Sequence, residues 1–140
     1  MKKESYPILA LDTRDPQEAK VIYFDGLKWV FKRISLNRPR RSELLVVINK
    51  FLDKQTKVKS LVIVNGQGQR FSSLRLGVVI ANSLSFALKV PLYQMILEVN
   101  ETSDDKLKEK IIARLNKEPL KSLTSVKPIY AHSPNITKGY

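Results

Sequence analysis

The chain has 140 residues, near the size of one domain, and it contains no cysteine. Disulfides, cysteine-ligated metals and thiol catalysis are thereby excluded, while 43% apolar and 27% charged residues predict a folded globular protein. The net charge of +12 is compatible with phosphate-rich partners. The polar start and the lack of a long apolar run argue against a secretory signal or membrane span, so we expect a cytoplasmic protein.

Three strands are predicted at the start of the chain. Residues 6–13 form a short apolar run that ends in a turn. Residues 19–24 and 27–34 are joined by Asp25 and Gly26, a strong hairpin signal because glycine readily adopts positive φ. These segments predict one strand followed by a β-hairpin.

Helices and strands then alternate. Ser42 can cap an amphipathic helix that ends near residue 54, and residues 58–65 form an apolar strand. A second helix is expected over residues 73–89, and a fifth strand over residues 91–96. Strands linked by helical crossovers lie parallel, so this region predicts a parallel part of the sheet.

A third helix is predicted over residues 104–117, with Thr102 and Ser103 as caps. Its apolar stripe consists of Leu107, Ile111 and Leu115. Residues 119–140 are rich in proline, serine and isolated apolar residues, which predicts an extended C-terminal tail. The order β-β-β-α-β-α-β-α predicts an α/β fold, a five-stranded mixed sheet with packed helices.

The glycine-rich segment 65–77 lies between a strand and a helix, where free N–H groups can bind phosphate. It lacks the Gly-Lys-Ser/Thr of a Walker loop, and Phe71 stands where the dinucleotide pattern has its third glycine. A tight turn capped by Ser72 or Ser73 is therefore favoured over a nucleotide site.

Candidate catalytic groups are few. Asp12 and Asp15 have no histidine or second acidic cluster nearby and are interpreted as turn residues, and the one histidine, His132, lies in the tail. One histidine cannot build a histidine-based metal site or a convincing triad. We therefore expect no catalytic residue, no metal and no cofactor.

Small residues recur on the second helix at Gly77, Ala81 and Ser85, spaced i, i+4 and i+8. A glycine inside a helix costs about 1 kcal/mol relative to alanine, so it usually has a packing reason. The strip allows a close approach by another backbone, and the sequence leaves open whether that backbone belongs to the chain's own sheet or to another subunit.

Basic residues are concentrated around the third strand, with Trp29 and Phe31 between them. The candidate RNA contacts are Lys28, Lys32, Arg33, Arg38, Arg40 and Arg41. The alternative is a solvated strand edge whose charges discourage pairing with another strand.

Several segments together resemble the TsaB (YeaZ) family. Residues 8–13 read ILALDT, similar to the family's usual I-L-A-I-D-T-S, and residues 66–78 and 81–92 resemble its G-P-G-S-F-T-G-L-R-I-G signature and the helix and strand that follow. The matching motif residues are Asp12, Thr13, Gly66, Gly68, Phe71, Arg75 and Gly77. The loop departs from the family pattern at Gln67, Gln69, Arg70 and Ser73, and Arg41 replaces the family's histidine.

The resemblance implies that residues 1–100 form an actin-like (ASKHA) lobe. Family members have two similar lobes, so a helix within residues 101–118 would replace most of the second lobe, and residues 119–140 resemble the family's C-terminus. It further implies a non-catalytic scaffold for the catalytic subunit TsaD in threonylcarbamoyladenosine modification of transfer RNA.

The family pairs with TsaD through the two helices of this lobe, which predicts a partner surface here, for TsaD or for a second copy of the chain. The predicted interface residues are Leu44, Val47, Ile48, Phe51, Leu74, Gly77, Val78, Ala81, Leu84 and Ser85. An RNA-binding domain that contacts transfer RNA is the alternative function. An enzyme of phosphoryl transfer or peptidase type is a third hypothesis.

Overall fold

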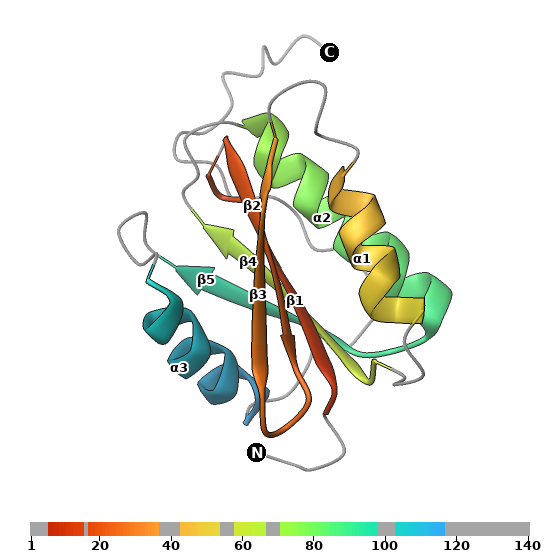
Figure 1. The fold of residues 1–140 in the computed structure, drawn as a ribbon, viewed down its shortest axis with the longest axis vertical. Coiled ribbons are helices and arrows are strands. Elements are labelled where there is room, and N and C mark those ends of the chain that lie inside the picture. The colour runs from red at the N-terminus through yellow and green to blue at the C-terminus, as the bar shows by residue number, and fades with distance from the viewer. Residues whose placement is uncertain are drawn as a thin grey trace, which may run out of the picture.

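The computed structural model describes residues 6–15, 17–36, 43–53, 58–66, 71–97 and 103–116. A central sheet lies between helices on its two faces (Figure 1). The predicted tail and the predicted sites at Arg38, Arg40, Arg41 and Gly68 lie outside the described residues.

Five strands and three helices follow one another in the predicted order. They are β1 (Ile8–Asp12), β2 (Glu18–Phe24), β3 (Trp29–Ser35), α1 (Glu43–Asp53), β4 (Ser60–Gly66), α2 (Phe71–Leu88), β5 (Leu92–Leu97) and α3 (Asp104–Leu115). The predicted order β-β-β-α-β-α-β-α is confirmed, with element ends shifted by a few residues.

The strands form one mixed sheet in the order β3-β2-β1-β4-β5. β2 pairs antiparallel with both β1 and β3, whereas β4 pairs parallel with β1 and with β5. The hairpin turn explains the antiparallel half, because Gly26 has φ 105° there. The crossovers through α1 and α2 explain the parallel half, so the predicted five-stranded mixed sheet is confirmed.

Helices α1 and α2 cover one face of the sheet. Alternate strand residues such as Leu9, Val21 and Ile63 form a continuous core with Ile48 of α1 and Val78 of α2. The period of two in the strands and of 3.6 in the helices brings these apolar residues together. This face therefore holds the larger core.

Helix α3 covers the opposite face (Figure 1). Its predicted stripe of Leu107, Ile111 and Leu115 is buried against Ile8, Val62, Met95 and neighbouring apolar side chains. Ser103 caps the helix as predicted, because its Oγ accepts a hydrogen bond from the Lys106 N–H at 3.2 Å. α3 is thus a full layer of this domain.

None of the helices in the described part of the chain is both long and apolar enough to cross a membrane.

Candidate functional site

The end of β1 carries a buried ion pair. The Arg14 Nε and Nη2 atoms each donate to a different carboxylate oxygen of Asp12 at 2.9 Å, and both residues are 6% exposed. The Arg14 backbone N–H also donates to Asp12 Oδ1 at 3.1 Å. Asp12 therefore holds the turn after β1 and has its carboxylate occupied by a neighbour, in agreement with the turn interpretation.

Asp15 also acts in a turn. Its Oδ1 accepts a hydrogen bond from the Gln17 N–H at 2.8 Å, the Asx geometry by which aspartate holds its own backbone. Both carboxylates singled out in the sequence are thus used by the fold around them.

The motif residues around α2 bring helix and sheet close together. Thr13 is fully buried, and a Cβ at Gly77 would collide with its Oγ1. Gly66 has φ 149°, and a Cβ there would collide with the backbone oxygen of Leu97. The two glycines are therefore needed for packing at the end of the sheet where α2 begins.

The other motif residues lie on or near the same helix. Arg75 is exposed on α2, and Phe71 is the first residue of the helix, although its side chain lies outside the description. Because α2 begins at Phe71, Ser72 and Ser73 lie inside the helix, and the predicted cap at one of these serines is wrong.

The predicted interface residues whose side chains the structure describes pack inward, and their contact with a partner stays a prediction. Those placed in or against the core of the chain itself are Leu44, Val47, Ile48, Phe51, Gly77, Val78, Ala81, Leu84 and Ser85. These residues form the most regular apolar stripe of each helix, and the chain's own sheet covers both stripes. The side chain of Leu74 lies outside the description. The strip of small residues faces the sheet, which settles the choice left open by the sequence.

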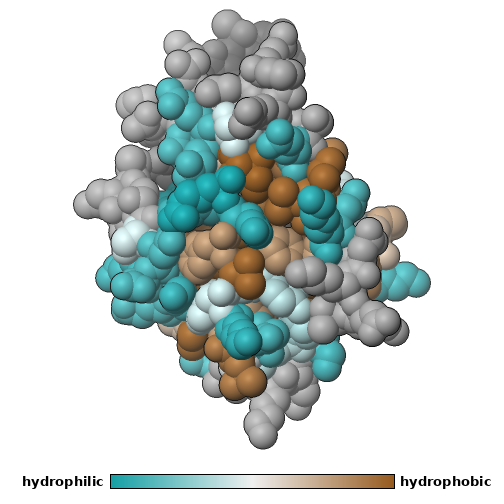
Figure 2. Space-filling view, viewed as in Figure 1, coloured by the Kyte–Doolittle hydropathy of each residue, from teal (hydrophilic) through white to brown (hydrophobic). Residues whose placement is uncertain are grey.

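The two helices also carry large apolar side chains that are exposed to solvent. These residues, which we call the outer apolar strip, are Leu45, Val46, Val79, Phe86 and Leu88. All are at least 40% exposed, and Phe86 is 74% exposed. Figure 2 shows apolar atoms among hydrophilic ones in the region where Figure 1 draws α1. Such a concentration of large apolar side chains on two adjacent elements is typical of a binding surface.

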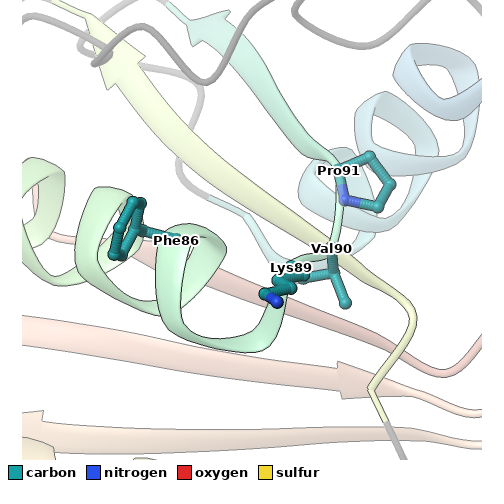
Figure 3. Close-up of a pocket in the computed structure, with 4 residues that line it drawn as sticks. All are labelled: Phe86, Lys89, Val90 and Pro91. Carbon is teal, nitrogen blue, oxygen red and sulfur yellow. The ribbon is translucent and has the colours of Figure 1, made fainter.

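A hollow of about 420 Å³ continues the outer apolar strip at the end of α2. It is lined by Phe86, Lys89, Val90 and Pro91 (Figure 3). The turn beside it is well defined, because Ser85 Oγ donates to the Val90 carbonyl at 2.8 Å and Lys89 adopts φ 56°. The hollow offers a place for an apolar side chain of a partner.

The outer apolar strip was not predicted from the sequence, because the inward stripe of each helix follows the 3.6-residue period more closely. A signal was present, since Val79 and Phe86 are spaced i and i+7 and so share a face opposite the small-residue strip. A helix that is apolar on two sides needs two partners, one of which is the sheet.

The described basic candidates do not gather into one patch. Lys32 and Arg33 are adjacent in β3 and therefore point to opposite faces of the sheet. Arg33 is also engaged, with Nη2 at 2.6 Å from Asp104 Oδ2 and Nε at 3.7 Å from Glu18. Lys28 is exposed beside the hairpin. Among the described residues, Lys32 and Arg33 of the predicted RNA surface thus lie on different faces of the sheet.

The similarity of this chain to known proteins lies in its fold. No protein-family model and no curated protein matches the chain. Among solved structures, YeaZ from Pseudomonas aeruginosa aligns with 64% of this chain at 22% identity and a TM-score of 0.55. The chain shares its fold with YeaZ.

The aligned part is 43% of the YeaZ chain, so the similarity spans less than half of that protein. At this level of identity it establishes the fold, and the α/β arrangement is consistent with the actin-like lobe expected from the sequence.

Proposed function

We propose that the chain is a non-catalytic scaffold subunit that binds a TsaD-type catalytic subunit through the outer apolar strip. The observation that carries this proposal is the exposure of Leu45 and Val46 on α1 together with Val79, Phe86 and Leu88 on α2. The fold of YeaZ and the sequence resemblance support the choice of partner. The setting is threonylcarbamoyladenosine modification of transfer RNA.

The strip has the composition of an interface core. Burial of a valine, leucine or phenylalanine side chain stabilises a complex by about 1.5–3 kcal/mol before the costs of association. Polar or charged residues surround the strip, including Glu43, Asn49 and Lys50 on α1 and Arg75 on α2. An apolar centre with a polar rim is the usual anatomy of a protein interface.

Phe86 is the natural anchor. It is the most exposed member of the strip, and it borders the hollow with Pro91 (Figure 3). Large aromatic side chains at the centre of an interface commonly contribute most of the binding free energy. We therefore expect substitutions at Phe86 to weaken partner binding more than those at Val46.

A scaffold role follows from the same geometry. The described residues form one lobe, which would provide one half of a two-lobed nucleotide site, and the carboxylate of Asp12 is occupied by Arg14. The inward stripes of α1 and α2 maintain the fold, so the outer strip is available to a second protein. Chemistry on transfer RNA would then belong to the partner.

Co-expression with a tagged TsaD-type subunit tests the proposal. The wild-type chain should co-purify in a fixed ratio, and Phe86→Glu should abolish or strongly reduce recovery because it places a charge in a desolvated contact. Leu27→Glu is the matched control, since Leu27 is 90% exposed but lies on the β2–β3 hairpin. Loss of the complex in Leu27→Glu, or its persistence in Phe86→Glu, would contradict the proposed surface.

The same strip can pair two copies of the chain when the partner is absent. Light scattering during gel filtration would then show a dimer that Phe86→Glu converts to a monomer. A dimer unaffected by this change would place self-association elsewhere on the molecule.

A further inference from the structure

A row of aromatic rings lies on the α3 side of the sheet, formed by Tyr6, Phe24, Trp29 and Phe31. Tyr6 meets Phe24 edge to face at 5.1 Å between ring centroids, and Phe24 stacks on Trp29 at 4.1 Å with the rings 9° from parallel. Phe31 lies 6.1 Å from Trp29. The fold thus builds a continuous aromatic row that ends on β3.

The row reaches the edge strand of the described sheet at Trp29 and Phe31. Trp29 is directly opposite Phe24 in the β2–β3 register, so the indole stacks on the side that faces the sheet interior. β3 is an edge strand, and in the described sheet no strand follows it on the other side. Trp29 and Phe31 are only half-buried. A planar group can therefore extend the stack from the outer side of Trp29.

Positive charge borders the rings. Lys28 precedes Trp29 and is exposed, and the Lys108 ammonium lies 5.8 Å from the centre of the Phe31 ring. Among the described residues neither lysine has a carboxylate ion-pair partner. Lys108 is placed to meet negative charge on a ligand that reaches the rings, and Lys28 lies next to Trp29 in the chain.

Asp25 and Asp104 are used by the fold, whereas Asp105 and Glu109 are exposed near Lys108 in the sequence of α3. Asp25 accepts hydrogen bonds from the backbone N–H groups of Lys28 and Leu27, each at 2.8 Å, and these bonds lower its pKa. Asp104 is bound by Lys20 and Arg33. The exposed Asp25 charge partly offsets Lys28, which leaves Lys108 as the stronger cation beside the rings.

We infer that this surface binds single-stranded nucleic acid, with a base stacked on Trp29 and phosphates beside Lys28 and Lys108. Stacked bases on exposed aromatic rings, combined with cations that follow the phosphate backbone, are the usual means of binding single strands with little sequence preference. The inference does not depend on the proposed partner surface, which lies across the sheet on α1 and α2. One molecule can therefore use both surfaces at once.

Pairing of β3 with a strand of a second copy is the competing use of this edge. Lys32 and Arg33 stand side by side on the edge strand and project to its two faces. Charged side chains on an edge strand oppose pairing with another strand, and two copies would bring like charges together. Charge complementarity thus favours a polyanion.

Trp29 is the only tryptophan in the sequence, so its fluorescence reports on the proposed site alone. Titration of the full chain with oligo(U) and with oligo(dT) should quench this emission, and the affinity should fall as salt rises because phosphate contacts release counterions. Equal binding of the two oligomers would assign the site to single strands in general, and a preference for oligo(U) would assign it to RNA. Both results support the inference.

Variants can distinguish binding at this site from the general attraction of nucleic acid to a basic protein. Lys108→Ala and Lys28→Ala should each reduce quenching affinity and flatten the salt dependence, whereas Lys50→Ala on the opposite face of the sheet should change neither. Trp29→Leu, followed by the anisotropy of a labelled oligomer, should weaken binding about tenfold or more. Circular dichroism would confirm that Trp29→Leu is folded, and the surface lysine variants keep the test valid if it is not.

Three results would overturn the inference. They are absence of quenching at low salt, equal losses in Lys50→Ala and Lys108→Ala, and a protein dimer that dissociates in Trp29→Leu. The third result would assign the edge to self-pairing. None of the three bears on co-purification with a TsaD-type subunit, so the two proposals can fail separately.

Discussion

The helices on the two sides of the sheet bury similar apolar stripes against it, but they differ in the faces that they turn to solvent. Inward residues of α1, α2 and α3 are buried to the same degree, as Ile48, Val78 and Ile111 illustrate. The outer face of α3 is charged, with exposed Asp105 and Glu109. The outer faces of α1 and α2 instead carry the outer apolar strip.

This difference distinguishes the apolar stripes that the fold buries from the apolar residues that it leaves exposed. A helix needs only one apolar stripe to dock on a sheet, and α3 has only that stripe. α1 and α2 have a second one that the described fold leaves in contact with solvent. The difference is consistent with a structural role for α3 and supports the proposal that the other side binds a protein.

Truncation of the inward stripes should give the largest losses and should be similar on both sides. Ile48→Ala and Ile111→Ala each remove a fully buried side chain and should lower the free energy of unfolding by about 2–5 kcal/mol in urea melts. The outward control Val79→Ala should cost about 0.5 kcal/mol or less. A loss below about 1 kcal/mol for Ile111→Ala would show that α3 is dispensable to the fold.

The next largest loss of stability is expected where α2 closely approaches the end of β1. Gly77→Ala improves helix propensity by about 1 kcal/mol, but its Cβ would collide with the buried Thr13 hydroxyl. We expect a net loss of about 1–3 kcal/mol in thermal or urea unfolding, since an overpacked core must shift. Ser83→Ala, at an exposed position of the same helix, is the control and should be neutral or slightly stabilising. A stabilised Gly77→Ala variant would contradict this packing.

The ion pairs of Asp104 should contribute little to stability, and their contribution should fall at low pH. Burial acts to raise the pKa of Asp104, but hydrogen bonds from Arg33 and Lys20 outweigh it, so the pKa lies below its ordinary value of 3.8. The stability from this cluster is therefore present above pH 3.8 and is lost as the pH falls through the lowered pKa.

Asp104→Asn tests this contribution. It should cost about 1 kcal/mol or less at neutral pH, since the cluster is partly exposed. Unfolding curves at several pH values should show the difference from wild type shrinking below pH 3.8. A difference that stays constant into acid would contradict the ion-pair explanation.

The smallest effect on stability is expected on the outer apolar strip. Phe86→Gln should change the free energy of unfolding of the isolated chain by no more than about 0.5 kcal/mol, because the ring has few partners in the fold. Yet the same change should weaken binding to the TsaD-type subunit in a calorimetric titration. A large loss of stability would mean that Phe86 belongs to the core.

Local sequence signals predicted most of the fold. Period-two strands, the Asp25-Gly26 turn and the Ser103 cap each depend on nearest neighbours in the chain, and all three were found where expected. Element ends were less accurate, and the second helix begins at Phe71, two residues before its predicted start. Helix ends depend on backbone hydrogen bonds that composition only partly determines.

The functional surface could not be predicted in the same way. Periodicity shows that a stripe is apolar but does not show what covers it. From the sequence, Ala81 and Val78 could therefore contact either a partner or the sheet, and the structure packs them against the sheet. The aromatic row was also hidden, because Tyr6 and Trp29 are brought to Phe24 only through the pairing of β2 with β1 and β3. Both findings required the three-dimensional arrangement.

Hydrogen–deuterium exchange of the chain, alone and in complex with a TsaD-type subunit, tests the central claim most directly. The account predicts slower exchange in α1 and α2 on complex formation, because a partner on the outer apolar strip excludes water and suppresses local opening. α3 should exchange as it does in the free chain. Protection confined to α3, with α1 and α2 unchanged, would contradict the assignment of the two sides of the sheet.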